Sequence, residues 1–134
     1  MQNINKEKLL KRMLFMVFFV FGLNSLAMKF YWYSMIWWFD MPMHFLGGFF
    51  VGLAWMFVFL PKDFTYQGGW GKSIFKIILG VLLIGVLWEI FEILVDKTIS
   101  QNPFNTLDTI SDICFDVAGG FTAIFYFLKR IMSV

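Results

Sequence analysis

The sequence predicts an all-α membrane protein in which four transmembrane helices form one bundle. Three observations lead to this prediction. Of the 134 residues, 60% are hydrophobic and only 15% are charged, whereas about a quarter of the residues of an average soluble domain are charged. The apolar residues are gathered in four runs, each close to the roughly 20 residues that cross a bilayer as a helix. The segments between the later runs are rich in residues that favour loops.

The predicted helices cover residues 13–33, 40–60, 73–95 and 108–128, and residues 1–134 form a single membrane domain. The aromatic stretch "FYWYSMIWWF" (30–39) follows the first run. Its Tyr and Trp side chains are typical of a membrane–water interface. Residues 61–72 and 96–107 contain the Pro, Gly, Asn and Asp of connecting loops.

The first run has a second interpretation. The basic segment "KEKLLKR", the apolar run and "SLA" together resemble a signal peptide that is cleaved after small residues. The apolar and aromatic character continues past Ala27, however, and cleavage would leave only three spans. We therefore expect an uncleaved first helix.

Lys and Arg residues predict the orientation, because cytoplasmic loops carry an excess of them. With four spans, only Lys29 and Lys97 lie on the side away from the termini. The other nine lie on the side of both termini, and they are Lys6, Lys8, Lys11, Arg12, Lys62, Lys72, Lys76, Lys129 and Arg130. The sequence therefore predicts a multi-pass protein of the cytoplasmic (inner) membrane with both termini in the cytoplasm.

Most of the acidic residues fall in the outer half of this arrangement. Seven of the nine do so, and they are Asp40, Glu89, Glu92, Asp96, Asp108, Asp112 and Asp116. Those on each helix are three or four residues apart and share a face, and an ionisable residue within a span turns towards the bundle interior. We expect the three helices to enclose an acidic cavity that opens outward.

The candidate site residues follow from this geometry. His44 is the only histidine of the chain and a candidate catalytic acid or base, with Asp40 one turn before it to orient the ring. A histidine with several carboxylates also suits a divalent metal ion. The expected metal ligands are Glu89, Glu92, Asp112, Asp116 and His44.

Two glycine pairs follow the polar positions. Gly47 and Gly48 come after His44, and Gly119 and Gly120 come after Asp116. Small residues allow close approach between helices in membranes, so these pairs are predicted helix-packing positions.

Three motifs carry a family resemblance. They are "DMPMHFLGG" (40–48), "WEIFE" (88–92) and "DTISD" (108–112) with "AGG" (118–120). Together they resemble the VanZ-like membrane proteins and, more closely, the YjdF-like bacterial inner-membrane family. VanZ-like chains commonly have Gln where Glu92 stands and Asn where Asp116 stands. The resemblance implies a helical membrane fold and a site at these motifs, without a defined activity.

Three functions remain open. The preferred one is metal-assisted chemistry on, or binding of, an envelope lipid or small ligand. Binding or transport of a proton or small cation is the second, because clustered intramembrane acids are typical of proton relays. The third is a structural polar network that joins the helices. The acids are accompanied by no obvious nucleophile and by no cluster of basic residues that could hold a phosphate.

The expected partners follow from the composition. Membrane lipids are the expected partners of so apolar a chain, and copies of it could also form a homo-oligomer. With a net charge of +2 and scattered basic residues, the chain lacks the basic patch that nucleic-acid binding needs.

Overall fold

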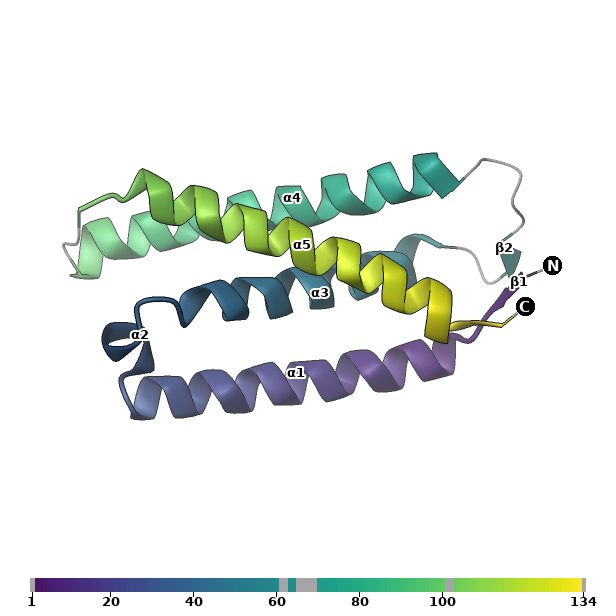
Figure 1. Cartoon of the computed structure of the whole chain (residues 1–134), viewed down its shortest axis with the longest axis horizontal. Coiled ribbons are helices and arrows are strands. Elements are labelled where there is room, and N and C mark those ends of the chain that lie inside the picture. Colours follow the sequence, from purple (N-terminus) through teal and green to yellow (C-terminus); the bar gives the residue numbers. More distant parts are fainter. Residues whose placement is uncertain (1, 61–62, 65–69, 101–102, 134) are drawn as a thin grey trace.

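The computed structural model describes residues 2–60, 63–64, 70–100 and 103–133. Four long helices run along the length of the molecule (Figure 1). They are α1 (Lys6–Lys29), α3 (Asp40–Phe59), α4 (Trp70–Val95) and α5 (Thr106–Arg130). Each is long and apolar enough to cross a membrane. The predicted all-α bundle with four candidate spans is therefore confirmed.

The helix α1 begins seven residues earlier than expected and ends sooner. At its start, the side chain of Asn5 accepts a hydrogen bond of 2.9 Å from the backbone N–H of Lys8 and so caps the helix. Beyond its last residue, Tyr31 has a positive φ of 57°. A helix cannot continue through a left-handed residue, so the chain turns and forms the short helix α2 (Trp32–Met35).

Both termini lie at one end of the bundle, where three short strands meet (Figure 1). The strands β1 (Gln2–Ile4), β2 (Asp63–Phe64) and β3 (Met132–Ser133) form an antiparallel sheet in the order β2-β1-β3. These strands were not predicted from the sequence, in which they fall in a loop and at the two termini. This end of the bundle is called the terminal end below. Lys62, which was expected there, lies outside the described residues.

Glycines allow α3 and α5 to pack backbone against backbone. A Cβ atom added at Gly48 would overlap the backbone of Asp116, and one added at Gly119 would overlap the carbonyl of Phe45. One turn further along α3, a Cβ at Gly52 would lie 2.8 Å from that of Ala123. These contacts hold the two helices in a fixed register around the polar residues.

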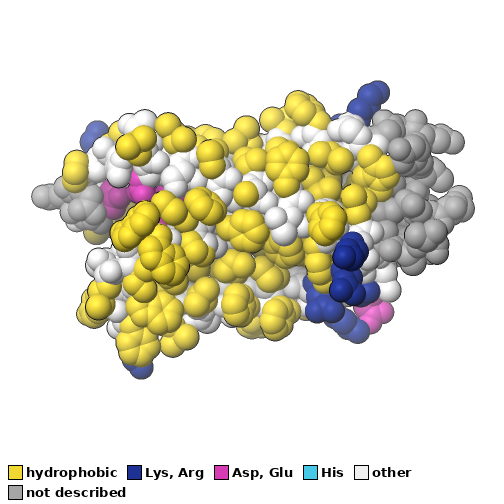
Figure 2. Space-filling model, viewed as in Figure 1, with side chains coloured by type: hydrophobic (Ala, Val, Ile, Leu, Met, Phe, Trp, Pro, Cys, Tyr) yellow, Lys and Arg dark blue, Asp and Glu magenta, His cyan; other side chains and the backbone are white. Residues whose placement is uncertain are grey.

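Apolar side chains fill the interior on the terminal side and also cover the outside. The buried core includes Leu9, Leu53, Met56, Ile77 and Phe127, from all four long helices. Figure 2 shows hydrophobic side chains over most of the visible surface between the two ends. In water such a surface would be unstable, whereas a bilayer provides an apolar environment for it.

We predict that the stability of the protein depends on the close approach of α3 and α5. Gly119→Ala should lower the free energy of unfolding by about 2 kcal/mol, because the added methyl group forces two backbones apart. Chemical unfolding in detergent measures this change. Gly22→Ala in α1 is the matched control, since its added Cβ would meet no neighbouring helix within 4 Å. Equal stabilities of the two variants would contradict the packing described above.

Candidate functional site

The imidazole ring of His44 lies at the centre of a cluster of carboxylates. The side chain is buried, with 5% of the residue exposed. Its Nε2 atom lies 3.7–3.9 Å from carboxylate oxygens of four residues, Asp40, Glu89, Glu92 and Asp112. On the other side of the ring, Nδ1 lies 3.4 Å from Oδ2 of Asp116. The five acids and His44 are called the acidic cluster below.

Three helices supply the acidic cluster, at the spacings that the sequence shows. Asp40 is the first residue of α3, one turn before His44. Glu89 and Glu92 lie one turn apart near the end of α4, and Asp112 and Asp116 lie one turn apart near the start of α5. Antiparallel packing of α4 and α5 brings the end of one beside the start of the other. The structure thus brings together every residue predicted to be catalytic or metal-binding.

The buried carboxylates carry more negative charge than one imidazole can neutralise. Glu89, Asp112 and Asp116 are 4%, 2% and 7% exposed. In the described part of the chain, no Lys or Arg forms an ion pair with any acid of the cluster. An isolated charge in a medium of low dielectric constant costs several kcal/mol. The cluster therefore requires bound protons or an added cation.

The distances around Nε2 suit a shared cation better than hydrogen bonds. Contacts of 3.7–3.9 Å exceed the length of a hydrogen bond, and Nε2, Oε1 of Glu89 and Oδ1 of Asp112 are buried with no hydrogen-bond partner among the described residues. Ligand atoms about 2.1 Å from a tetrahedral zinc ion lie about 3.4 Å apart. The separations between Nε2 and the carboxylate oxygens are about 0.3–0.5 Å longer than this.

Two overlapping groups within the cluster have the separation of metal ligands. Asp40, His44 and Asp112 form one group, and His44, Glu89 and Glu92 form the other. In each group the ligand atoms lie within 4.8 Å of one another. The shared member is His44, so a cation bound at its ring could be held by either group.

Asp116 has a different position from the other acids. Its Oδ2 atom lies within hydrogen-bond distance of Nδ1, at 3.4 Å, and it belongs to neither group of candidate ligands. Metal-binding histidines almost always donate their second ring N–H to an acceptor of this kind. The geometry thus gives Asp116 the orienting position that the sequence suggested for Asp40, and places Asp40 on the side of Nε2.

Gly85, which was not among the residues predicted from the sequence, makes room for Asp116. A Cβ atom at Gly85 in α4 would lie 2.6 Å from Oδ2 of Asp116. Gly47 in α3 lies on the other side, where an added Cβ would come 3.9 Å from Oδ1. The only sequence signal for Gly85 is its place four residues before Glu89, on the same face of α4.

A cavity of about 240 Å³ adjoins the cluster at the end of the bundle away from the termini. Acidic side chains are visible near that end in Figure 2, and most visible Lys and Arg side chains lie near the terminal end. The cavity is lined by Glu89, Glu92, Ile93, Asp96, Lys97, Pro103, Phe104, Asn105, Asp108 and Thr109. Two acids of the cluster therefore border a space that a small ligand or hydrated ion could occupy.

Tyr33 of α2 is a neighbour of the cluster, although the sequence predicted it only as part of an aromatic belt. Its hydroxyl donates a hydrogen bond of 2.7 Å to Oδ1 of Asn24 in α1. Burial, followed by the negative charges of Asp40 and Glu92, raises the pKa of Tyr33 to about 12. The short helix α2 thus places a neutral phenol beside the acids.

Comparison with models of protein families gives a match. The family model described as "Predicted membrane protein (DUF2238)" matches residues 4–132, nearly the whole chain. No curated protein and no solved structure matches the chain. The match agrees with the membrane-protein part of the resemblance seen in the sequence.

We predict that the phenol of Tyr33 stays protonated until well above pH 10. Its pKa of about 12, against an ordinary value of 10.0, means that ionisation is delayed by burial and by nearby negative charge. The difference in tyrosinate absorbance between the wild type and Tyr33→Phe measures this titration. Asp40→Asn should lower the midpoint only in part, because burial is the larger cause. A midpoint near 10 in both backgrounds would contradict the proximity of Tyr33 to the acids.

Proposed function

We propose that this chain, which belongs to the DUF2238 family of predicted membrane proteins, binds one divalent metal ion at the acidic cluster. The bound ion would then hold or activate a phosphate-bearing envelope lipid or small ligand in the adjoining cavity. One observation carries the proposal. Nε2 of His44, buried and without a hydrogen bond among the described residues, lies 3.7–3.9 Å from four carboxylates.

The ligand types favour a transition metal or zinc. Mg²⁺ and Ca²⁺ prefer sites made of oxygen alone, whereas imidazole together with carboxylates suits Zn²⁺, Mn²⁺ or Fe²⁺. His44 would bind through Nε2, with oxygens drawn from Asp40, Glu89, Glu92 and Asp112. Asp116 would hold the ring in place through Nδ1.

The lining of the cavity supports the proposal that the ligand contains phosphate. It borders two acids of the cluster, Glu89 and Glu92, and also Lys97. A divalent ion supplies Lewis-acid chemistry and binds a phosphoryl oxygen, and the ammonium group of Lys97 adds a positive charge at the cavity wall. Without the ion, the acids would repel a phosphate group, so ligand binding should depend on the metal.

The charge distribution supports an outward-facing cavity. Lys and Arg residues concentrate near the terminal end, and cytoplasmic segments carry the excess of such residues. On this rule both termini are cytoplasmic and the cavity faces the cell envelope. The resemblance of the motifs around His44, Glu92 and Asp112 to VanZ-like and YjdF-like inner-membrane proteins supports the same location.

A second candidate function is favoured by the excess of acids. Without a metal ion, the buried carboxylates must retain protons, because only one imidazole lies among them. Groups coupled in this way can take up and release protons together. Proton or small-cation binding is therefore the alternative function. A purely structural network is disfavoured, since it would satisfy Nε2 with a hydrogen bond.

We predict one metal ion per chain. Protein that has been stripped with a chelator and reloaded with Zn²⁺ or Mn²⁺ should retain one equivalent, as measured by elemental analysis. Glu89→Gln and Asp112→Asn should each weaken binding at least about tenfold, because each removes a charged ligand. The matched control is Glu7→Gln, since Glu7 is exposed near the terminal end and pairs with Lys11 at 2.6 Å.

The outcomes separate the candidate functions. Unchanged metal binding in the Glu89 and Asp112 variants would contradict the site, and a metal-free protein with pH-dependent proton uptake would favour the alternative. For the ligand, short-chain phosphatidic acid should raise the melting temperature of the metal-loaded protein by more than it raises that of the stripped protein. The same shift in stripped protein would contradict the role of the ion.

A further inference from the structure

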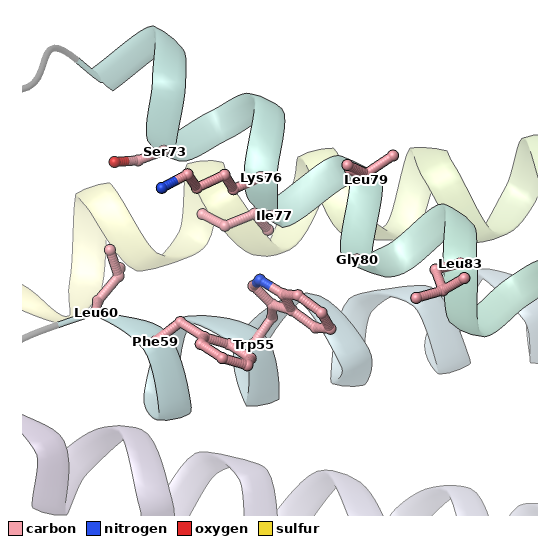
Figure 3. Close-up of a pocket in the computed structure, with 9 residues that line it drawn as sticks. All are labelled: Trp55, Phe59, Leu60, Ser73, Lys76, Ile77, Leu79, Gly80 and Leu83. Atoms are coloured by element: carbon pink, nitrogen blue, oxygen red, sulfur yellow. The ribbon is translucent and has the colours of Figure 1, made fainter.

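A second cavity, of about 530 Å³, lies between α3 and α4 and is separate from the acidic cluster. Trp55 and Phe59 of α3 border it on one side, and Leu79 and Leu83 of α4 on the other (Figure 3). Its lining includes no residue of the acidic cluster and none that lines the cavity beside that cluster. The cavity is therefore not an extension of the proposed metal site. It is called the lateral groove below.

The lateral groove is open towards the hydrocarbon of the bilayer. It lies between two helices that are long and apolar enough to span a membrane. Three of its apolar side chains are largely exposed, namely Phe59 at 61%, Leu79 at 52% and Leu83 at 53%. In a membrane, lipid covers such side chains, so an acyl chain can enter the groove from the side.

The polar side-chain atoms of the groove can all donate hydrogen bonds. They are Nζ of Lys76, Oγ of Ser73 and Nε1 of Trp55, and no carboxylate lines the groove. Figure 3 shows the Lys76 and Ser73 side chains at the same end of the groove. Within the described ranges, no hydrogen bond or ion pair occupies these three groups. Their charge and donor character complement an anion.

Gly80 shapes the apolar wall of the groove. The ring of Trp55 lies against it so closely that an added Cβ would come within 2.5 Å of the ring. The indole is further held by Phe59, whose ring centroid lies 4.6 Å away. The wall is therefore preformed, which lowers the entropic cost of holding a flexible chain against it.

We propose that the lateral groove binds one anionic phospholipid. The lipid phosphate lies on Lys76 and Ser73, and an acyl chain runs past Trp55 towards Leu83, about 10 Å further along α4. Lys76 is about 9 Å inside the start of α4 at Trp70. From such a depth a lysine side chain extends its ammonium group towards the lipid headgroups. A zwitterionic lipid would fill the apolar part equally well but would bring its own cation to Lys76.

Native mass spectrometry of the full chain in detergent tests the proposal, with phosphatidylglycerol and phosphatidylcholine of identical acyl chains as probes. The wild type should bind phosphatidylglycerol about five times more tightly, the effect expected of one lysine near an anionic headgroup. Lys76→Gln should abolish this preference. Lys129→Gln is the control, because Lys129 is also near the terminal end but packs over Phe125 instead of lining the groove.

A wild type without headgroup preference, or an equal loss of preference in both lysine variants, would overturn the proposal. The wild type could instead form dimers that exclude lipid and that dissociate in Leu83→Trp. Such dimers would show a second copy of the chain in the groove and would also overturn the proposal. Fluorescence quenching locates the lipid independently. Brominated phosphatidylglycerol should quench the emission that Trp55→Phe removes, and more strongly than brominated phosphatidylcholine does. Equal quenching by the two lipids would contradict the assignment of the headgroup to Lys76.

Discussion

The cost of burying charge in an apolar environment determines how this bundle is arranged. Four spanning helices must place their ionisable groups away from lipid, and three of them carry acids within their spans. Turning these acids inward makes them neighbours, and their mutual repulsion then requires a cation or protons between them. The imidazole of His44 occupies the middle of that space, with four carboxylates around Nε2 and Asp116 beside Nδ1.

Close helix packing is the structural condition for this arrangement. The contact of Gly48 and Gly119 with the opposite backbone brings α3 and α5 close enough for His44 to reach Asp112 and Asp116. Gly85 then leaves space on α4 for the carboxylate of Asp116. The same helices are further stabilised by an apolar core on the terminal side. Rigid packing on one side of the cluster and a cavity on the other suit a site that admits a ligand without rearranging the bundle.

Much of this could be predicted from the sequence because hydropathy and helical spacing act locally. Runs of apolar residues predicted the four spans, and intervals of three and four residues put Glu89 beside Glu92 and Asp112 beside Asp116. The meeting of the acids with His44 followed from the cost of exposing charge to lipid. None of these inferences needed the distance between two helices.

Features that depend on the distance and rotation between helices could not be predicted. Asp116, and not Asp40 as predicted, lies beside Nδ1 because of the side of the imidazole that each helix faces. The space that Gly85 leaves for Asp116 arises from a contact between helices that are far apart in the sequence. The same is true of the groove beside Trp55 and Gly80. The turn at Tyr31 and the short helix α2 depend on a left-handed residue that is not a glycine, which the sequence does not reveal.

Because the chain contains a single histidine, nitrogen NMR of protein labelled with ¹⁵N in histidine tests the central claim most directly. On addition of one equivalent of Zn²⁺, the Nε2 resonance of His44 should shift to a metal-bound value while Nδ1 remains protonated. The same addition should have no such effect in Asp112→Asn. An Nε2 resonance that does not move at saturating Zn²⁺, or that moves equally in Asp112→Asn, would show that the imidazole and the carboxylates do not form one cation site.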